Sequence, residues 1–437
     1  MARVLTGLDR LVRDGISLPG GGRVAVLCNA TTVSSSWLPS VDALLQVPGI
    51  RLERIFSPQH GFASEKQDNM VESVDSSHPR LGIPIISLYG DRREVHSADL
   101  DGIDAVIIDL PDIGTRVYTF LTTAIFMIRA AAGRGVPVFI LDRPNPIGGV
   151  VEGPVLDDAF HSFVGMIDVP LRHGLTIGEL CLYGAWRMQL PPTQTGWIRV
   201  MSMEGWRRSL YYNQTGLPWT MPSPNMPTPE TALVYAGQVV LEGTNLSEGR
   251  GTTRPFEFFG APYLDPPAVL DALQAEGLLE ERLLREERSA LAGSLASGTD
   301  STPEASVLGR TSAASEQPAL AGALLREVTY QPTFQKYARE LVRGFQLHVI
   351  DRNRFRPVMA SMAILWAVKR VHPKALDWRE PPYEYEKERM PIDLIYGTDQ
   401  VRLGLQAGMQ PREIAQDWES GVAAFKERVR PFLLYEQ

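Results

Sequence analysis

The stretch Asp104–Thr119, with the sequence DAVIIDLPDIGTRVYT, decides the fold class. Its first half is a short apolar run with several β-branched residues, and its second half is a polar turn that contains proline and glycine. A continuous apolar run of this kind suits a strand that is buried on both faces of a sheet. The residues from Thr115 to Ala132 predict a helix, which Gly133 and Gly135 end.

The same order of strand, polar turn and helix recurs through the first 150 residues. The apolar runs that end in a polar cluster are Arg23–Cys28, Leu52–Phe56, Ile83–Leu88, Asp104–Leu110 and Val136–Leu141. Alternation of buried strands with helices predicts an α/β fold with a Rossmann-like, doubly wound parallel sheet. In such sheets ligands bind outside the carboxyl ends of the strands. We therefore expect the polar clusters to converge on one site.

Changes in composition divide the rest of the chain. Leu217–Thr228 has four prolines in twelve residues, which indicates a rigid connector. We expect a Rossmann-like N-terminal domain over residues 1–225 and a smaller α/β C-terminal domain over residues 226–437. Of the 26 residues of Gly293–Pro318, 18 are Ser, Thr, Gly, Ala or Pro, and this stretch is predicted to be a disordered insertion.

The overall composition excludes several classes of protein. The chain has 437 residues, of which 44% are hydrophobic and 22% are charged, so disorder of the whole chain is excluded. The formal charge is −8 and no long basic run is present, so we expect no nucleic-acid partner. The apolar runs fall well short of the ~20 residues that cross a bilayer, so membrane insertion is not expected. The oligomeric state stays open.

The N-terminus and the cysteines favour a cytoplasmic location. The first residues lack the apolar core and cleavage site of a secretory signal, although a mis-assigned start codon would hide one. Cys28 and Cys181 are the only cysteines and neither lies in a CxxC motif. They form neither a disulfide framework nor a cysteine-rich zinc site.

The common catalytic motifs are absent. The sequence has no GxGxxG after a strand, no GxxxxGK[ST], no GxSxG and no HExxH. This disfavours dinucleotide enzymes, P-loop hydrolases, serine hydrolases and zinc proteases of those types. A phosphate-ester or amide hydrolase on this scaffold would need a metal or nucleophile cluster, and the sequence shows none. We therefore expect neither a metal nor a cofactor.

Once these motifs are excluded, the groups that remain as candidates for catalysis or binding are carboxylates, amides and arginines in polar turns. The candidate acids in these turns are Glu65, Glu72, Asp112, Asp142, Glu152, Glu179, Glu242 and Glu248. Two positioned carboxyl groups are the usual equipment for glycoside hydrolysis. One must stay protonated to donate to the leaving oxygen, while the other stays ionised.

Several longer strings, in fixed order, are much more specific. They are FSPQHG, SLYG, DIGTRVYT, LDRPNPIGG, VEGPVLD, SFVG, RHGLTIGEL, LPWTMPSPNMPT and EGTNLSEGRGTTRPFEFFGAP. Together they cover residues 5–265 densely, and the sequence resembles the NamZ-type exo-β-N-acetylmuramidase family. The remaining C-terminal part resembles that family in the order of its segments more than in its exact sequence.

The resemblance implies an exo-acting glycoside hydrolase. Such an enzyme releases N-acetylmuramic acid from the non-reducing ends of peptidoglycan fragments. The implied substrate is a small glycan, a muropeptide or a saccharide with muramic acid, and a role in cell wall recycling follows. The implied fold pairs a Rossmann-like domain with a smaller α/β domain, with the site in a cleft at the carboxyl ends of the strands.

One position departs from the family pattern. The family commonly has glutamate as the third residue of SPEHG, and this chain has Gln59 there. A glutamine is neither a proton donor nor an anionic nucleophile. Three interpretations follow: the family glutamate only binds sugar, another acid such as Glu65 or Glu72 replaces it, or hydrolysis is lost. In the last case the chain is a non-catalytic muropeptide-binding or sensing protein.

The resemblance and the polar turns together give the expected site residues. The candidate catalytic residues are Glu65, Asp112, Glu152 and Glu179. The candidate substrate-binding residues are Gln59, His60, Arg116, Tyr118, Arg143, Asn145, Arg172, His173, Asn225, Asn245, Glu248 and Arg250. Arg116 or Arg250 is expected to hold the lactyl carboxylate that distinguishes muramic acid, because the arginine fork matches a carboxylate.

Overall fold

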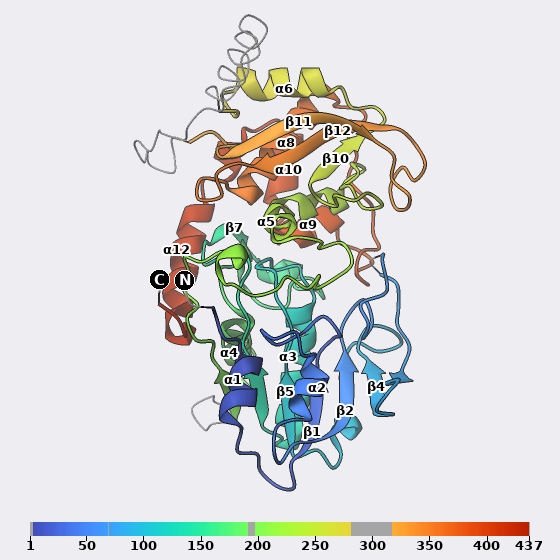
Figure 1. Cartoon of the computed structure of the whole chain (residues 1–437). Coiled ribbons are helices and arrows are strands. Elements are labelled where there is room, and N and C mark those ends of the chain that lie inside the picture. The colour runs from blue at the N-terminus through green and yellow to red at the C-terminus, as the bar shows by residue number, and fades with distance from the viewer. Residues whose placement is uncertain (1–2, 69, 191–196, 281–316, 437) are drawn as a thin grey trace, which may run out of the picture.

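The computed structural model describes residues 3–68, 70–190, 197–280 and 317–436. Figure 1 shows a lower domain built on a parallel sheet and an upper, C-terminal domain with its own smaller sheet. The insertion predicted at residues 293–318 lies outside the described residues, apart from its last two positions. No helix in the described ranges is long and apolar enough to cross a membrane.

The lower domain confirms the predicted doubly wound sheet. Its strands are β1 (Arg23–Leu27), β2 (Arg51–Ser57), β3 (Ser76–Ser77), β4 (Pro84–Ser87), β5 (Ala105–Ile108), β6 (Val138–Leu141) and β9 (Ile198–Met201). The spatial order is β3-β4-β2-β1-β5-β6-β9, and every neighbouring pair is parallel except β3–β4. Each of the five predicted strands is present within a few residues of its expected bounds.

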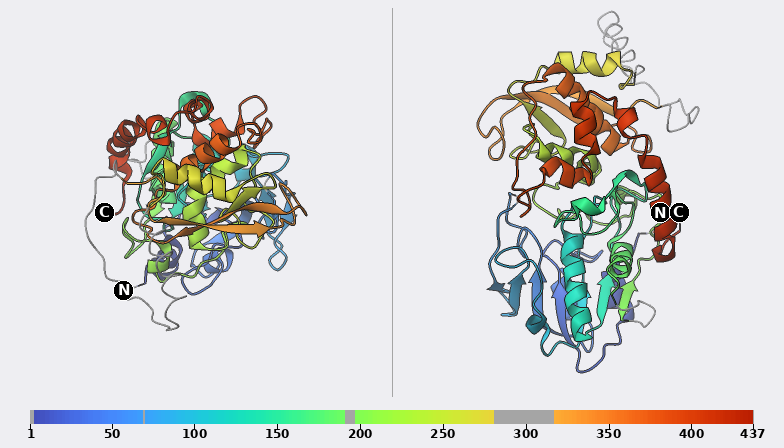
Figure 2. Two further views of the ribbon diagram at one scale, coloured as in Figure 1. Left: turned by 90° about the horizontal axis from the view of Figure 1, so that it is seen from above. Right: turned by 180° about the vertical axis from the view of Figure 1, so that it is seen from behind.

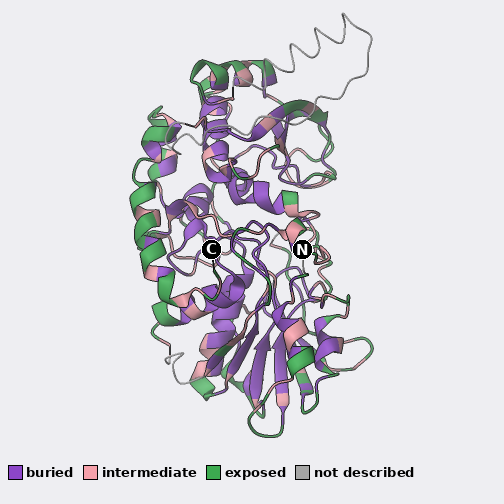
Figure 3. Cartoon of the chain, turned by 60° about the vertical axis from the view of Figure 1, so that its left-hand side comes forward, coloured by how far each residue is buried: buried purple, intermediate pink, exposed green. Residues whose placement is uncertain are grey.

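Helices cover both faces of this sheet, which explains why the strands read as continuous apolar runs. The helices are α1 (Gly7–Asp14), α2 (Ser40–Leu44), α3 (Phe120–Arg134) and α4 (Ile177–Arg187). In β1, Val24 and Val26 pack with the helices α1 and α2, whereas Ala25 and Leu27 pack with α3 and α4. Every residue of β5 and β6, and every residue of β1 after Arg23, is buried, and the strands are mostly purple in Figure 3. Alternate residues therefore serve two different apolar layers.

The helix predicted from Thr115 begins later, at Phe120. The intervening residues form a turn in which the Asp112 carboxylate accepts a hydrogen bond from the Gly114 amide at 2.6 Å. Gly114 has φ of 83°, and a side chain there would clash with Ile147, so the turn requires glycine. At the other end Gly135 is the left-handed C-cap, as predicted, whereas Gly133 lies inside the helix, which continues to Arg134.

The upper domain is the predicted smaller α/β unit. A three-stranded antiparallel sheet, in the order β10-β12-β11, consists of β10 (Phe258–Ala261), β11 (Ala323–Tyr330) and β12 (Val342–Val349). Its helices among the described residues are α5 (Pro229–Gln238), α6 (Pro266–Ala275), α8 (Pro357–Val371), α9 (Pro391–Tyr396), α10 (Gln400–Gln406) and α11 (Pro411–Ile414). The 3-10 helices in the described part of the chain are η1 (Ser97–Leu100), η2 (Asp158–Phe160), η4 (Tyr212–Gln214), η5 (Val239–Gly243) and η7 (Arg430–Phe432).

The chain returns to the lower domain at its C-terminal end. Helix α12 (Trp418–Val429) runs down the side of the molecule (Figure 2). It packs on the antiparallel ribbon of β7 (Glu152–Val155) and β8 (Pro170–Arg172). Beyond it, the Leu434 amide donates to Glu179 at 2.8 Å and the Tyr435 hydroxyl donates to Asp142. The chain therefore passes between the two domains twice, once near residue 225 and again through α12.

We predict that Gly237→Ala destabilises the upper domain by about 1–3 kcal/mol. Helices α5 and α8 cross at Gly237, and a Cβ atom there would overlap the Pro357 carbonyl. Urea denaturation with far-UV circular dichroism measures the effect. The matched control is Gly133→Ala in α3, where a Cβ meets nothing and stability should rise by roughly 0.5–1 kcal/mol. Equal behaviour of the two variants would contradict the close packing.

Candidate active site

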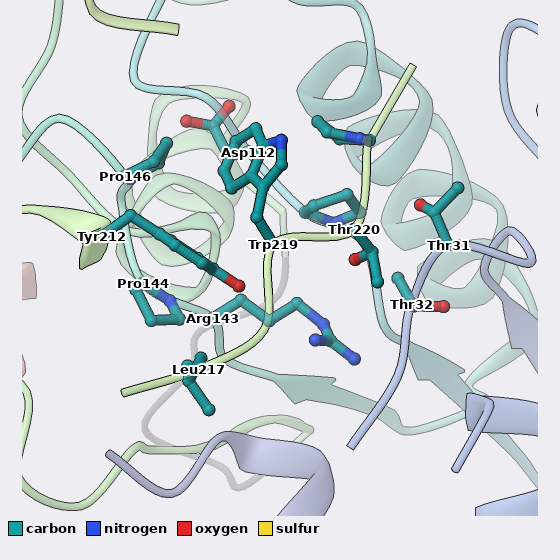
Figure 4. A pocket seen from close by; sticks show the side chains of 12 residues that line it. Thr31, Thr32, Asp112, Arg143, Pro144, Pro146, Tyr212, Leu217, Trp219 and Thr220 are labelled. Carbon is teal, nitrogen blue, oxygen red and sulfur yellow. The ribbon is translucent and has the colours of Figure 1, made fainter. Parts of the chain in front are cut away.

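Two neighbouring pockets lie at the carboxyl edge of the parallel sheet. Strand order reverses between β1 and β5, which is the topological switch point where ligands bind in this fold. The first pocket, which we term the switch-point pocket, is lined by Thr31 and Thr32 after β1, Asp112 after β5 and Arg143 after β6 (Figure 4). Trp219 of the proline-rich connector forms its opposite wall.

The second pocket is lined by both domains, and we term it the interdomain pocket. Gln59 and His60 follow strand β2, and Tyr118 and Thr119 precede α3. The opposite wall consists of residues from the connector and the upper domain, and its polar members are Ser223, Asn225, Tyr235, Glu242, Arg250, Tyr383 and Glu384. Two carboxyl groups and one guanidinium group therefore meet in a single pocket.

The structure brings together part of the predicted site. Gln59, His60, Tyr118, Asn225 and Arg250 line the interdomain pocket. Of the other predicted residues, Asp112 and Arg143 line the switch-point pocket, in which Arg143 is tied to Asp109 by an ion pair of 2.8 Å. The strand-end loops thus converge as expected, but on two pockets.

Gln59 is buried and bridges the two domains. Its Oε1 accepts a hydrogen bond of 2.6 Å from the Thr119 hydroxyl, and its Nε2 donates to Glu384 Oε1 at 3.2 Å. The hydroxyl of Tyr89 donates to the other carboxylate oxygen, Oε2, at 2.7 Å. Residue 59 thus presents an amide to a neighbouring acid instead of presenting an acid itself.

The environment of Glu384 keeps this carboxyl group protonated up to a pH near neutrality. Burial, followed by the charge of Glu242, raises the pKa of Glu384 to about 7, although the hydrogen bonds from Tyr89 and Gln59 oppose the shift. The side chain is 5% exposed. Its backbone lies in the left-handed region, with φ of 45°, and Tyr385 follows with φ of 73°. Such conformations are costly for residues other than glycine and gather at functional sites.

Glu242 lies across the same pocket in a contrasting environment. Its Oε1 is 2.8 Å from Arg250 Nη2, and its Oε2 accepts a hydrogen bond of 2.8 Å from the Tyr383 hydroxyl. A guanidinium partner favours the charged form of a carboxylate. The pocket thus holds one carboxyl group that is hydrogen-bonded by an amide and a hydroxyl and a second that is paired with a guanidinium, and two carboxyls in different environments are what acid and base roles require.

Arg250 is itself held by a buried charge network. Its Nη1 is 3.3 Å from Glu248 Oε1, and Glu248 is also 2.9 Å from the ammonium of Lys336. Although burial opposes the shift, Lys336 and then Arg250 lower the pKa of Glu248. The predicted residue Glu248 therefore lies behind Arg250 and fixes its orientation.

His60 enters the pocket as a neutral ring. Its Nδ1 is 2.8 Å from the Lys66 carbonyl, so this nitrogen carries the proton and Nε2 is left as an acceptor. Burial lowers the pKa of His60 to about 4, and the neighbouring Arg250 charge contributes to the shift. An acceptor nitrogen in a sugar pocket suits a hydroxyl donor.

Two predicted catalytic acids have structural contacts instead. Glu179 forms the capping box of α4 with Thr176 and pairs with Arg208. Glu152 accepts a hydrogen bond of 2.9 Å from the Met359 amide in the first turn of α8, and burial raises its pKa. Neither side chain lines the interdomain or the switch-point pocket.

Other predicted residues also lie away from the interdomain pocket. Glu65 and Glu72 are exposed, with side chains 52% and 53% accessible. The buried guanidinium of Arg116 donates to the carbonyls of Pro154, Val169 and Ile395 at 2.8–3.1 Å. The remaining members contact other parts of the chain: Asn145 donates to Leu175, Arg172 donates to Ile147, His173 lies 3.2 Å from Asp112, and Asn245 accepts from Tyr263.

Sequence reasoning missed Glu384, Tyr383 and Tyr89 as site residues. Glu384 lies in the stretch PPYEYE, and alternating tyrosine and glutamate after two prolines is a weak sign of a polar loop with a fixed shape. The rule that ligands bind outside the carboxyl ends of parallel strands indicated site residues only in the N-terminal domain. Glu242 was recognised as a candidate acid, but nothing in the sequence placed it opposite Gln59.

Comparison with known proteins identifies the family. Family models described as the N-terminal and C-terminal parts of "Exo-beta-N-acetylmuramidase NamZ" match residues 24–230 and residues 233–306 and 307–435. The chain is 31% identical to the peptidoglycan beta-N-acetylmuramidase NamZ of Bacillus subtilis, over 99% of this chain and 92% of the relative. The chain belongs to the NamZ exo-β-N-acetylmuramidase family.

Solved structures show the same NamZ-type architecture. A DUF1343 family protein of Bacteroides fragilis superposes with a TM-score of 0.79 at 26% identity, over the full length of both chains. A second DUF1343 protein of that organism has a TM-score of 0.69 at 23% identity, and it supports the fold alone. Within the described part of this NamZ family chain, no three His, Cys, Asp or Glu side chains are grouped so as to hold a metal ion.

We predict that His60→Asn reduces the acid sensitivity of this NamZ family member. The folded-state pKa near 4 lies below the unfolded value near 6.5, so the unfolded chain binds more protons as the pH falls and stability is lost. Between about pH 7.5 and about pH 5 this loss amounts to about 2 kcal/mol. Asparagine tolerates the left-handed backbone of residue 60, with φ of 74°, and does not titrate.

Urea unfolding at the two pH values checks this prediction. The matched control is His161→Asn, because the His161 side chain is 37% exposed. We expect the pH-dependent loss to shrink in the His60 variant and to stay unchanged in the control. An unchanged loss in both variants would contradict the assignment of a buried, neutral His60.

Proposed function

We propose that this chain is an exo-acting glycoside hydrolase that releases N-acetylmuramic acid from the non-reducing ends of peptidoglycan fragments. The observation that carries the proposal is the pair of buried carboxyls, Glu242 and Glu384, that line one interdomain pocket. Family membership supports the substrate class. Glycosidases place two carboxyl groups at the scissile bond, one as acid and one as base or nucleophile, around an oxocarbenium-like transition state.

The neutral polar groups of the pocket are suited to a sugar ring. His60 offers an acceptor nitrogen, and Tyr118 offers a hydroxyl group. Asn225 is fixed by a hydrogen bond of 2.7 Å to the Gln67 carbonyl and faces the same pocket. Such groups orient hydroxyl and acetamido substituents without changing charge during the reaction.

Arg250 is the candidate for recognition of the lactyl carboxylate. Its Nη atoms are engaged by Glu242 and Glu248, but its Nε–H has no hydrogen-bond partner among the residues that the structure describes. The guanidinium carbon lies 5.0 Å from the centre of the Phe256 ring, which keeps one face dry. Arg116, the other candidate, donates to three backbone carbonyls and does not line the pocket.

The non-catalytic alternative rested on Gln59. The structure brings the carboxylate of Glu384 to within 3.2 Å of the Gln59 amide, so an acid is available where residue 59 lacks one. Hydrolysis is therefore favoured over binding alone. We further propose a role in cell wall recycling, because an exo-acting enzyme shortens fragments one residue at a time, and the cytoplasmic location stays a prediction.

The test is hydrolysis of 4-nitrophenyl N-acetyl-β-muramide beside the matching N-acetyl-β-glucosaminide. We expect release from the muramide and far slower release from the glucosaminide, because only the muramide carries the lactyl carboxylate. A disaccharide with muramic acid at its non-reducing end should release the free sugar. Saturable binding of muramic acid in calorimetry, with no release from any muramide, would instead establish the binding-only alternative.

We predict that Arg250→Lys lowers kcat/KM for the muramide by about 10–100-fold and changes the glucosaminide much less. Lysine keeps the charge beside Glu242 but loses the planar fork, and a charge-assisted hydrogen bond is worth roughly 1.5–3 kcal/mol. The matched control is Arg254→Lys, since Arg254 pairs with Glu257 and its side chain is 48% exposed. Equal losses on both substrates would show that Arg250 only orients Glu242.

A further inference from the structure

The segment Pro381–Glu386 carries the upper domain's contribution to the site. Glu384 lines the interdomain pocket, yet its two carboxylate oxygens are held from the lower domain, by Gln59 Nε2 at 3.2 Å and by the Tyr89 hydroxyl at 2.7 Å. Two donors on two different oxygens fix both the position and the plane of the carboxyl group. Such fixation is what a group needs if it is to transfer a proton to one defined atom.

The residues on either side of Glu384 clamp the segment in place. Tyr383 donates to Glu242 at 2.8 Å on one side of the pocket. On the other side, the Tyr385 ring packs against Tyr89 and Phe163, with ring centres 5.6 and 6.3 Å apart. This packing holds Glu384 and Tyr385 in left-handed backbone conformations, with φ of 45° and 73°. Strain that the surroundings maintain in this way is a mark of a functional position.

We propose that Glu384 is the catalytic proton donor of this muramidase, oriented by Gln59 and Tyr89 as positioning residues. The proposal rests on the proposed function of the interdomain pocket. The Glu384 proton passes to the glycosidic oxygen as the bond from that oxygen to C1 breaks, and the leaving sugar departs as an alcohol. Water supplies the hydroxyl group that joins C1, and its remaining proton returns to the carboxylates of the site, so one water is consumed and no other co-reactant is required.

The contacts of the neighbouring groups exclude them from this role. Gln59 has no proton to give as an acid. Glu242 is ion-paired with Arg250 at 2.8 Å, which suits an anionic nucleophile or base. His60 directs its one ring proton to the Lys66 carbonyl. Glu384 is the remaining acid of the pocket, and it faces no cationic side chain at hydrogen-bond distance among the described residues.

The pH dependence follows from the charged and titratable groups that surround Glu384. The nearest of these groups are Tyr89, Tyr235, Glu242, Arg250, Tyr383 and Tyr385; His60 lines the same pocket, and Arg93 lies over the Tyr385 ring. Burial and the Glu242 charge raise the pKa of Glu384 to about 7. A donor must be protonated to act, so the rate should fall as the pH rises through about 7, and this alkaline limb belongs to Glu384.

The decisive experiment compares wild type with Glu384→Gln on two leaving groups. Loss of a general acid should lower kcat/KM for the muramic acid disaccharide by about 100–10,000-fold. The leaving group of an activated 2,4-dinitrophenyl muramide needs little protonation, so Glu384→Gln should lower kcat/KM for this substrate far less. The alkaline limb of the pH profile should be absent from the variant. Glu388→Gln is the control, because Glu388 lies outside this segment, is exposed and should keep full activity on both substrates.

A second variant, Tyr89→Phe, keeps the proposal testable if Glu384→Gln fails to fold. The Tyr89 hydrogen bond lowers the pKa of Glu384, so its removal should move the alkaline limb to higher pH. A purely structural role would lower the rate without moving the limb. Equal losses on both leaving groups in Glu384→Gln, or an unmoved limb in Tyr89→Phe, would overturn the assignment. Inactivity of wild type on every muramide would instead overturn the proposed function.

Discussion

The hydrogen bond between Gln59 and Glu384 is the interaction on which the site depends. It joins residues 325 positions apart in the chain and closes the carboxyl edge of the parallel sheet with a loop of the other domain. Without the upper domain, the polar turns after β1, β2 and β5 would face solvent, where carboxyl groups keep their ordinary acidity. Burial between the domains raises the pKa of Glu384 to about 7, and Arg250 forms an ion pair with Glu242 beside it.

Local sequence determined the sheet because each strand is buried on both faces. A short β-branched apolar run such as Val24–Leu27, bounded by polar turns and followed by a helical segment, indicates a buried strand, so the strands and the fold class were predictable. The start of α3 was not predictable, because the side chain of Asp112 stabilises a turn at Gly114 and the helix begins only at Phe120. The helix propensities of the residues after Thr115 do not predict such a turn.

The site was predictable only where it belongs to strand ends. Gln59 and His60 follow β2, and topology alone places them at the edge where ligands bind. Glu384 comes from an irregular loop of the other domain, and its position depends on domain packing that no local pattern encodes. The acids that sequence favoured have structural contacts with helix starts: Glu179 lies in the first turn of α4, and Glu152 of β7 accepts from an amide in the first turn of α8.

The return of the chain through α12 has a mechanical consequence. The domains are linked covalently by the proline-rich connector at Leu217–Thr228 and again by α12, beyond whose end Leu434 is tied to Glu179. Two attachments restrict the relative motion of the domains more than a single connector would. They therefore help to keep Glu384 of the PPYEYE loop against Gln59 of the lower domain.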